Sequence, residues 1–273
     1  MPEKPEVITV VESLKPNIIG RKITGCNVYW DNIIAYPISE EFRKRVVGQK
    51  INDITTRGKW IVLMLDFDSL LIHLRMEGKF YFRKVGEPLS KHEHVEFILD
   101  DGVSFRFHDV RKFGKMHLVD KNKVYEVEPL NEIGKEFDDK TLTEEYLYEK
   151  ICNKKLPIKT ILLDQSIICG IGNIYDDEIL FMSKIHPLRR GCDISLEECD
   201  LIIKNTRIVL KKAIKLGGTT IKSFTSSEGV HGLFQNELLV HGHGGEKCPV
   251  CSSILNKIKV GGRGTHYCEK CQK

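Results

Sequence analysis

The hydrophobic period of this chain changes partway along, and that change constrains its fold more than any other feature. From about Lys22 to Val119, apolar residues tend to alternate with polar ones. The pattern is clearest around an Asp-Gly pair at 101–102, where the alternating apolar residues are Val95, Phe97, Leu99, Val103, Phe105 and Phe107. Alternation on both sides of a turn predicts an antiparallel hairpin, so we expect this region to form a β-sandwich or small barrel.

Helical signals lie on either side of that region. Before it, Pro5 suits a first helical turn, Gly20 can close the segment, and apolar residues recur at helical spacing: Val7, Val10, Val11 and Leu14. After a polar stretch that begins at Glu128, the sequence predicts helices from about Pro157 to Gly170, from Asn173 onward, and from Ser195 to Gly217. Ser195 and Glu198 have the spacing of a capping box. The chain is therefore expected to be α+β, with strands first and helices later.

Composition restricts the function classes. A length of 273 residues with 41% apolar content is enough for two compact domains. The formal net charge of +4 suits a nucleic-acid partner without establishing one. No apolar run approaches membrane-spanning length, and the N-terminus lacks a signal pattern. We therefore expect a cytoplasmic protein with no membrane partner.

Four of the nine cysteines form two pairs near the C-terminus. The pairs fit the pattern C-x₂-C…C-x₂-C with 16 residues between them: Cys248, Cys251, Cys268 and Cys271. Two disulfides or four idle thiols are improbable in a cytosolic chain, whereas four thiolates at this spacing can close a tetrahedral site. The pattern predicts one structural Zn²⁺ ion that folds a hairpin. Arg263 lies among glycines between the pairs, where it can contact a phosphate or simply face solvent.

The N-terminus carries a candidate nucleophile. Removal of Met1 ahead of the small residue Pro2 would leave a secondary amine. An α-amino group has a pKa of about 7.7–8, and a following helix N-terminus disfavours the ammonium further. Such an amine can attack an aldehyde carbon, with Glu3 and Glu6 as proton donors or acceptors. A frayed end of the same composition is common, so this motif alone decides nothing.

Taken together, the chain resembles the formamidopyrimidine-DNA glycosylases, which excise 8-oxoguanine and ring-opened purines. The resemblance spans nearly the whole length. Its markers are P-E-K-P-E-V at 2–7, R-G-K at 57–59, H-L-R-M-E-G at 73–78, D-V-R-K-F-G at 109–114, L-L-D-Q with G-I-G-N-I-Y at 162–175, and G-G-R-G-T at 261–265, followed by the cysteine pairs. Several markers in the right order are far more specific than any one of them.

The resemblance implies an N-terminal antiparallel β-sandwich flanked by helices, then a helix-two-turn-helix module and a zinc-finger hairpin. We expect a catalytic domain over 1–127, a linker over 128–145, a DNA-binding domain over 146–240 and a zinc finger over 241–273. Loop 217–234 corresponds to the segment that closes over the extruded base. The implied partner is duplex DNA with a damaged base or abasic site, bound by a monomeric, nucleoid-associated bacterial enzyme.

The resemblance also implies residue roles. Pro2 is the expected nucleophile, Glu3 the general acid–base and Glu6 a supporting residue, while Lys59, expected on a strand, holds phosphate near the lesion. Three residues would fill the void left by the flipped nucleotide: Met76, Arg111 and Phe113. Arginine can hydrogen-bond the orphaned cytosine, and apolar wedges can keep the stack intact. The remaining expected DNA contacts are His73, Lys159, Asn173 and Arg263. Asn173 also suits a helix N-cap, behind a glycine turn that can face an anion.

Two departures and two alternatives accompany this assignment. Lys4 stands where the family typically has leucine, and Ile8 where a third glutamate is frequent. The first alternative is the sister enzyme endonuclease VIII, which prefers oxidised pyrimidines; the segments at 73–78 and 109–114 favour the purine enzyme. The second is a non-catalytic zinc-finger protein that binds distorted duplex, in which Pro2, Glu3 and Glu6 would have no chemical role.

Overall fold

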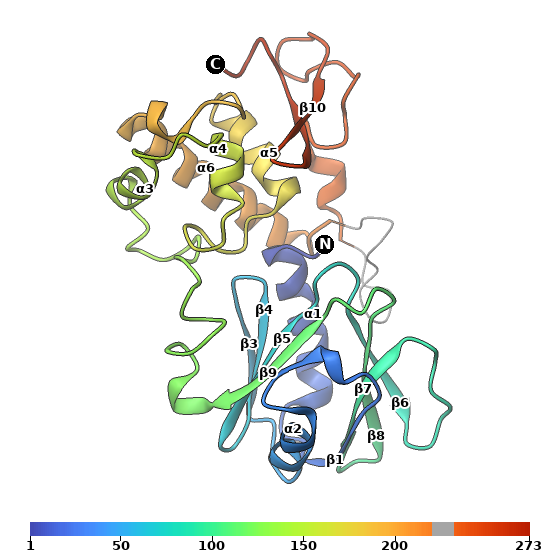
Figure 1. The fold of residues 1–273 in the computed structure, drawn as a ribbon. Coiled ribbons are helices and arrows are strands. Elements are labelled where there is room, and N and C mark those ends of the chain that lie inside the picture. Colours follow the sequence, from blue (N-terminus) through green and yellow to red (C-terminus); the bar gives the residue numbers. More distant parts are fainter. Residues whose placement is uncertain (220–231) are drawn as a thin grey trace. The chain divides into compact units, whose positions relative to one another are not determined.

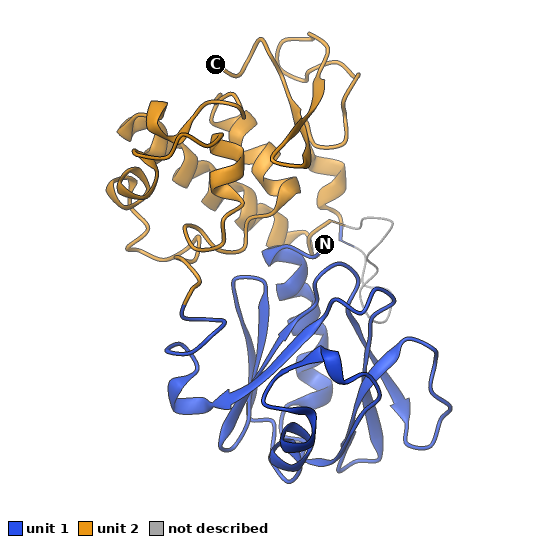
Figure 2. Ribbon diagram, viewed as in Figure 1, with its two compact units in different colours: residues 1–131, 220–232 blue, residues 132–219, 233–273 orange. Residues whose placement is uncertain are grey.

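The structure is a computed structural model that describes residues 1–219 and 232–273. It divides into two compact units, with residues 1–131 in unit 1 and residues 132–219 and 233–273 in unit 2 (Figure 2). The boundary falls inside the stretch 128–145 that the sequence indicated as a linker. Most of loop 217–234, expected to close over an extruded base, lies outside the described residues.

Unit 1 contains two sheets and the helices beside them (Figure 1). The first sheet has the order β1-β7-β8-β6, from β1 (Ile23–Val28), β7 (Glu93–Leu99), β8 (Val103–His108) and β6 (Lys79–Lys84). The second has the order β2-β9-β5-β4-β3, from β2 (Ile34–Tyr36), β9 (Lys115–Asp120), β5 (Asp68–His73), β4 (Trp60–Met64) and β3 (Asp53–Arg57). The helical elements are α1 (Lys4–Ile18), η1 (Asp31–Ile33), α2 (Ser39–Val46) and η2 (Lys121–Lys123).

The predicted hairpin is confirmed, and one strand pair departs from the expected antiparallel pattern. Strands β7 and β8 pair antiparallel across the Asp-Gly turn, where Gly102 has a φ of +81°. Strand β2 pairs parallel with β9. This three-residue edge strand is remote from β9 in sequence, so no tight turn dictates its direction.

One hydrophobic core serves both sheets and α1. The predicted apolar face of α1, which includes Val7 and Leu14, is at most 2% exposed and shares a cluster with residues of both sheets. Full burial of such a side chain contributes about 1.5–3 kcal/mol. The N-terminus of α1 is thereby anchored to the sandwich, and with it the residues at the start of the chain.

Unit 2 combines helices with the C-terminal hairpin (Figure 1). The elements are α3 (Glu144–Ile151), α4 (Ile158–Leu162), α5 (Asn173–Met182), η3 (Gly191–Asp193), α6 (Leu196–Lys215), η5 (Phe234–Glu237), β10 (Asn256–Val260) and β11 (Arg263–Tyr267). Helix α3 was not predicted from the sequence; it begins after Thr143, whose side chain accepts the Tyr146 N–H. In the described residues, no helix is both long and apolar enough to cross a membrane.

Helix boundaries in unit 2 bear out one prediction and correct two. Ser195 caps α6 in a reciprocal capping box with Glu198, as predicted. Helix α4 ends at Leu162 rather than near Gly170, because Gln165 binds the Gly170 N–H and the Ile171 carbonyl and so holds a non-helical turn. Asn173 is the first residue of α5 and not its N-cap, a position that Gly172 occupies.

Candidate functional site

The first turn of α1 fixes the residues at the start of the chain. Glu3 is the N-cap, and Glu6 Oε2 accepts the Glu3 N–H at 2.8 Å in a reciprocal capping box. Both carboxylates are at most 4% exposed, and Pro2 is buried. Glu6 therefore holds the peptide that follows Pro2, which defines where the nitrogen of residue 2 lies.

The electrostatics at the chain terminus favour a neutral amine. Burial lowers the pKa of the terminal amine of Met1, and the charge of Lys59 lowers it further. The negative charges of Glu3, Glu6 and Glu77 act in the opposite direction, but the net shift is downward. The same groups would surround the Pro2 nitrogen once Met1 is removed. An amine with a lowered pKa carries a larger neutral, nucleophilic fraction near pH 7.

Lys59 lies in a tight turn, which corrects its expected place on a strand. Arg57 and Trp60 pair across β3 and β4, so Gly58 and Lys59 form the two-residue connection, with a φ of +54° at Gly58. Lys59 is 6% exposed. Only glycine takes a positive φ at no steric cost, and this turn brings the ammonium near the chain terminus.

His73 ends β5 as a neutral, oriented imidazole. Its ring packs edge-on against Trp60 at 4.8 Å between centroids, and its Nδ1 accepts the Arg75 N–H at 2.9 Å. Burial, with the charges of Arg75 and Lys59, lowers the pKa of His73 to about 3. The acceptor role of Nδ1 places the single proton on Nε2, which is thus a neutral donor suited to a phosphate oxygen.

Lys4, one of the two departures from the family pattern, is accommodated by a polar contact. Its side chain is buried and its Nζ donates to Thr56 Oγ1 at 2.9 Å. A buried amine needs a hydrogen-bond partner of this kind, whereas a leucine side chain at the same place would need none.

The expected wedge residues lie on two turns of unit 1. Met76 occupies the turn between β5 and β6 and is half-buried, rather than part of the core. Phe113 lies on the loop between β8 and β9 and is 52% exposed, with the Arg111 guanidinium 5.3 Å from its ring centre. A large apolar side chain left in solvent on a short loop suits insertion into a base stack.

In unit 2, side chains of α5 bind the outer edge of β11. Asn173 Nδ2 donates to the Gly264 carbonyl at 2.9 Å, and one turn later Asp177 Oδ2 accepts the His266 N–H at 3.1 Å. Residues four apart on a helix share a face, and residues two apart on a strand share an edge. The hairpin that presents Arg263 is therefore fixed to the N-terminus of α5.

Lys159 occupies a different environment from the one expected of a phosphate contact. It is fully buried, and its Nζ donates to Asp177 Oδ1 at 2.6 Å and lies 3.8 Å from Asp176 Oδ2. A side chain with no exposed surface has no access to a phosphate in this conformation. We therefore assign Lys159 to the interior of unit 2, where it neutralises buried carboxylate.

Asp177 joins Lys159 to two histidines. Its Oδ2 contacts His241 Nδ1 at 2.7 Å and His266 Nδ1 at 3.2 Å, in addition to the His266 N–H. Asp177, His241 and His266 have the composition of a metal site. Because four donors already surround the two oxygens of Asp177, hydrogen bonds account for the cluster without an ion.

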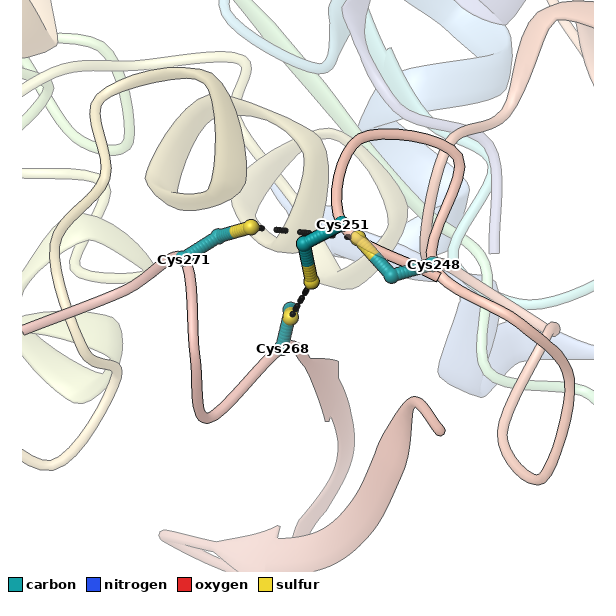
Figure 3. Close-up of side chains that lie close together, drawn as sticks. All are labelled: Cys248, Cys251, Cys268 and Cys271. Atoms are coloured by element: carbon teal, nitrogen blue, oxygen red, sulfur yellow. Dashed lines mark hydrogen bonds between the residues drawn. The ribbon is translucent and has the colours of Figure 1, made fainter. Parts of the chain in front are cut away.

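The four C-terminal cysteines converge as predicted (Figure 3). The Sγ atoms of Cys251 and Cys268 lie 3.5 Å apart, those of Cys248 and Cys271 lie 3.9 Å apart, and all four lie within 4.8 Å of one another. Zn–S bonds of about 2.3 Å in a tetrahedron separate the sulfurs by about 3.8 Å, so the cage fits zinc. All four ligands are protein thiolates, and the ion's role is structural.

Comparison with known proteins covers the whole chain. Three protein-family models match the chain. The family model of the formamidopyrimidine-DNA glycosylase N-terminal domain matches residues 1–116, that of the formamidopyrimidine-DNA glycosylase H2TH domain matches 133–225, and that of the zinc finger found in FPG and IleRS matches 245–273. A formamidopyrimidine-DNA glycosylase of Oceanobacillus iheyensis is 44% identical over 273 residues, covering 100% of this chain and 98% of the relative.

Solved structures give the same result. A Lactococcus lactis FPG variant bound to DNA that contains Fapy-dG superposes with a TM-score of 0.92, at 37% identity and 100% coverage of both chains. The Lactococcus lactis enzyme bound to abasic-site DNA gives the same score and identity over 99% of both chains. The expected α+β architecture, with its helical module and zinc finger, is confirmed. This chain belongs to the formamidopyrimidine-DNA glycosylase family.

Proposed function

We propose that this chain removes oxidised purines from duplex DNA and cleaves the strand through an imine at Pro2. The observation that carries the proposal is the buried start of α1, where Glu3, Glu6 and Lys59 surround the terminal amine and its pKa is lowered. The relatives named above support the substrate class. Neither alternative, a pyrimidine-specific endonuclease VIII or a non-catalytic zinc-finger protein, accounts for these findings as well.

The reaction begins after Met1 is removed. The neutral Pro2 nitrogen attacks C1′ of the damaged nucleotide, the C1′–base bond breaks, and the base leaves with a proton. Opening of the sugar ring gives an imine between Pro2 and C1′. Glu3 is placed to carry the protons, since it lies one residue from the nucleophile and is held by the capping box.

Strand cleavage follows from the imine. The iminium acidifies the C2′ hydrogen, whose loss expels the 3′ phosphate; a second elimination expels the 5′ phosphate, and hydrolysis frees Pro2. Lys59 and the neutral Nε2–H of His73 serve as phosphate contacts near this centre. Asn173 and Arg263 contribute phosphate contacts from unit 2, where the zinc hairpin is fixed to α5. The enzyme works as a monomer on bacterial chromosomal DNA in the cytoplasm.

The test is borohydride trapping of the mature protein on duplex DNA with one 8-oxoguanine opposite cytosine. A covalent product that maps to residue 2, and is absent from Pro2→Gly, is the expected result. Trapping only on an oxidised pyrimidine would favour the endonuclease VIII assignment. No trapping on either substrate, with a free N-terminal proline and bound zinc, would favour a damage-binding protein.

A second experiment isolates Glu3. Glu3→Gln keeps the shape and removes the ionisable carboxyl, so base excision should fall at least about 100-fold while duplex binding is retained. Glu12→Gln is the matched control, because Glu12 lies on the same helix but is exposed. Undiminished excision by Glu3→Gln would rule out its role.

A further inference from the structure

The two turns that carry Met76 and Phe113 end on glycines that pack against one ring. A β-carbon on Gly78 would lie 2.9 Å from Phe107 Cζ and 2.6 Å from the Leu74 carbonyl oxygen. On Gly114 it would lie 2.6 Å from Phe107 Cζ. Phe107 is 0% exposed, in β8. Turns far apart in sequence are thus held against the same core side chain, which leaves no space for a larger residue at either glycine.

A buried carboxylate spans the second of these turns. Asp109 is 0% exposed; its Oδ1 accepts the Arg111 N–H at 3.0 Å and its Oδ2 accepts the Gly114 N–H at 2.8 Å. Its own backbone is held as well, since its N–H donates to the His92 carbonyl and its carbonyl contacts His94 Nε2, both at 2.9 Å. Asp109 therefore fixes both ends of the loop that presents Arg111.

The side chains in the middle of the loop are exposed, and Lys112 Nζ lies 3.9 Å from the centre of the Trp30 ring. Val110, Arg111, Lys112 and Phe113 are all exposed, and Lys112 adopts a φ of +58°, a strained value for a lysine. A loop with an exposed, strained middle depends on its anchors for its conformation. Its buried anchors are the Asp109 carboxylate and the Phe107 ring.

We propose that Asp109, supported by Phe107, is a positioning residue that determines which base is accepted opposite the lesion. The inference rests on the proposed function and on the role that the family resemblance implies for Arg111, a contact with the orphaned base. A guanidinium offers donors only, and these match the adjacent acceptors O2 and N3 of cytosine. Adenine presents a donor beside an acceptor on that edge. Discrimination between them requires Arg111 to be held within about 0.5 Å, and Asp109 supplies that constraint.

Asp109→Asn tests the proposal with a minimal change. The amide retains one oxygen, but its NH₂ group faces one of the two loop N–H donors, so one end of the loop is released. Asp109→Asn, its control variant described below and wild type are assayed as mature full-length proteins. The assay measures excision of 8-oxoguanine opposite cytosine and opposite adenine. Trapping on single-stranded abasic DNA, which has no opposite base, reports the imine chemistry separately.

The matched control is Asp120→Asn. Asp120 also accepts a backbone N–H through its carboxylate, from Asn122 at 2.8 Å, but is exposed at the other end of β9. We expect Asp109→Asn to lower the cytosine-to-adenine ratio of kcat/KM about tenfold, as loss of one charge-assisted hydrogen bond implies, with trapping unchanged. Asp120→Asn should alter neither.

Each other outcome has a definite meaning. An unchanged ratio in Asp109→Asn, or an equal fall in excision and trapping, overturns the proposal. If Arg111→Ala lowers the ratio and Asp109→Asn does not, only this inference fails. If Arg111→Ala leaves the ratio as in wild type, the expected role of Arg111 fails and this inference fails with it. If wild type gives no trapping at Pro2, the proposed function itself fails.

A second variant pair keeps the proposal testable if Asp109→Asn does not fold. Gly114→Ala places a methyl group against Phe107 and should lower the ratio. Phe107→Leu removes the ring atoms against which both turns pack, so it should lower the ratio as well. A ratio that both Gly114→Ala and Phe107→Leu leave unchanged overturns the role of the shared anchor.

Discussion

Replacing Lys159 with methionine separates a buried ion pair from a phosphate contact. The side chains of Lys159 and Asp177 are both 0% exposed. Removing one partner of a buried pair costs about 3–5 kcal/mol, because the other charge stays buried. Asp177 keeps its contacts with His241 and His266, so we expect the lower end, about 3 kcal/mol.

The matched control is Lys204→Met. Lys204 pairs with Asp200 one turn away on α6, but its side chain is 63% exposed. Exposed pairs at this spacing contribute about 0.3–0.5 kcal/mol. The two substitutions remove the same charge, so the difference between them reports the burial of Lys159 and of its two carboxylate neighbours, Asp176 and Asp177.

The assay is urea unfolding, monitored by fluorescence and by circular dichroism. Both tryptophans, Trp30 and Trp60, belong to unit 1, so their fluorescence reports that unit. Far-ultraviolet circular dichroism includes the helices of unit 2. Lys159→Met should move the dichroism transition down by about 1 M urea or more and leave the fluorescence transition in place.

DNA binding supplies the refuting result. Loss of one phosphate contact reduces the steepness of the plot of log binding constant against log salt concentration by about 0.9, and we expect this for Arg263→Ala. Lys159→Met should leave that slope unchanged where unit 2 is folded. A reduced slope with unaltered stability would show that Lys159 reaches DNA and that its buried conformation is not the functional one.

Three further predictions concern unit 2. Removal of zinc by a chelator should abolish duplex binding through loss of the hairpin, and tight binding by chelated protein, with zinc loss shown by metal analysis, would contradict this. Burial alone would raise the pKa of Asp177, but hydrogen bonds from His241 and His266 and the charge of Lys159 lower it to about 2. A carboxyl group whose pKa is lowered on folding stabilises the fold at pH values above its ordinary pKa of 3.8, so about 2 kcal/mol should be lost as the pH falls from 3.8 towards 2. Acid titrations followed by circular dichroism should show this loss, and Asp177→Asn should flatten it. Ser195→Ala should destabilise unit 2 by about 1 kcal/mol in urea, and no change would show that the α6 cap is dispensable.

Local patterns predicted the elements whose causes are local. The β7–β8 hairpin follows from alternation and an Asp-Gly turn, the α6 start from a serine and a glutamate three residues apart, and the metal cage from cysteine spacing. In the first two cases residues close in sequence supply the stabilising interaction, and in the third the two C-x₂-C pairs are recognisable as metal ligands from their spacing. Sequence alone is enough where that holds.

Features that depend on distant residues could not be predicted. The phosphate contact expected of Lys159 came from the family resemblance, and nothing near it in the sequence indicates its buried pairing with Asp177, eighteen positions away on another helix. Asn173 had the composition of an N-cap, but its amide is engaged by Gly264 of the hairpin. Nothing in the sequence around Asp109 indicates that its carboxylate is buried, because the residues that cover it come from other parts of the sheet. Period and propensity carry no information about such tertiary contacts.

The contact between α5 and β11 has a consequence for solubility. A two-stranded sheet has two open edges, and unpaired backbone groups there can recruit a strand from another molecule. Along β11, Asn173 and Asp177 occupy a carbonyl and an N–H that such a strand would need. Along β10, Lys257 and Lys259 are exposed, and charge on an edge disfavours addition of a further strand. Both edges of the hairpin are thereby protected against pairing with a strand of another molecule.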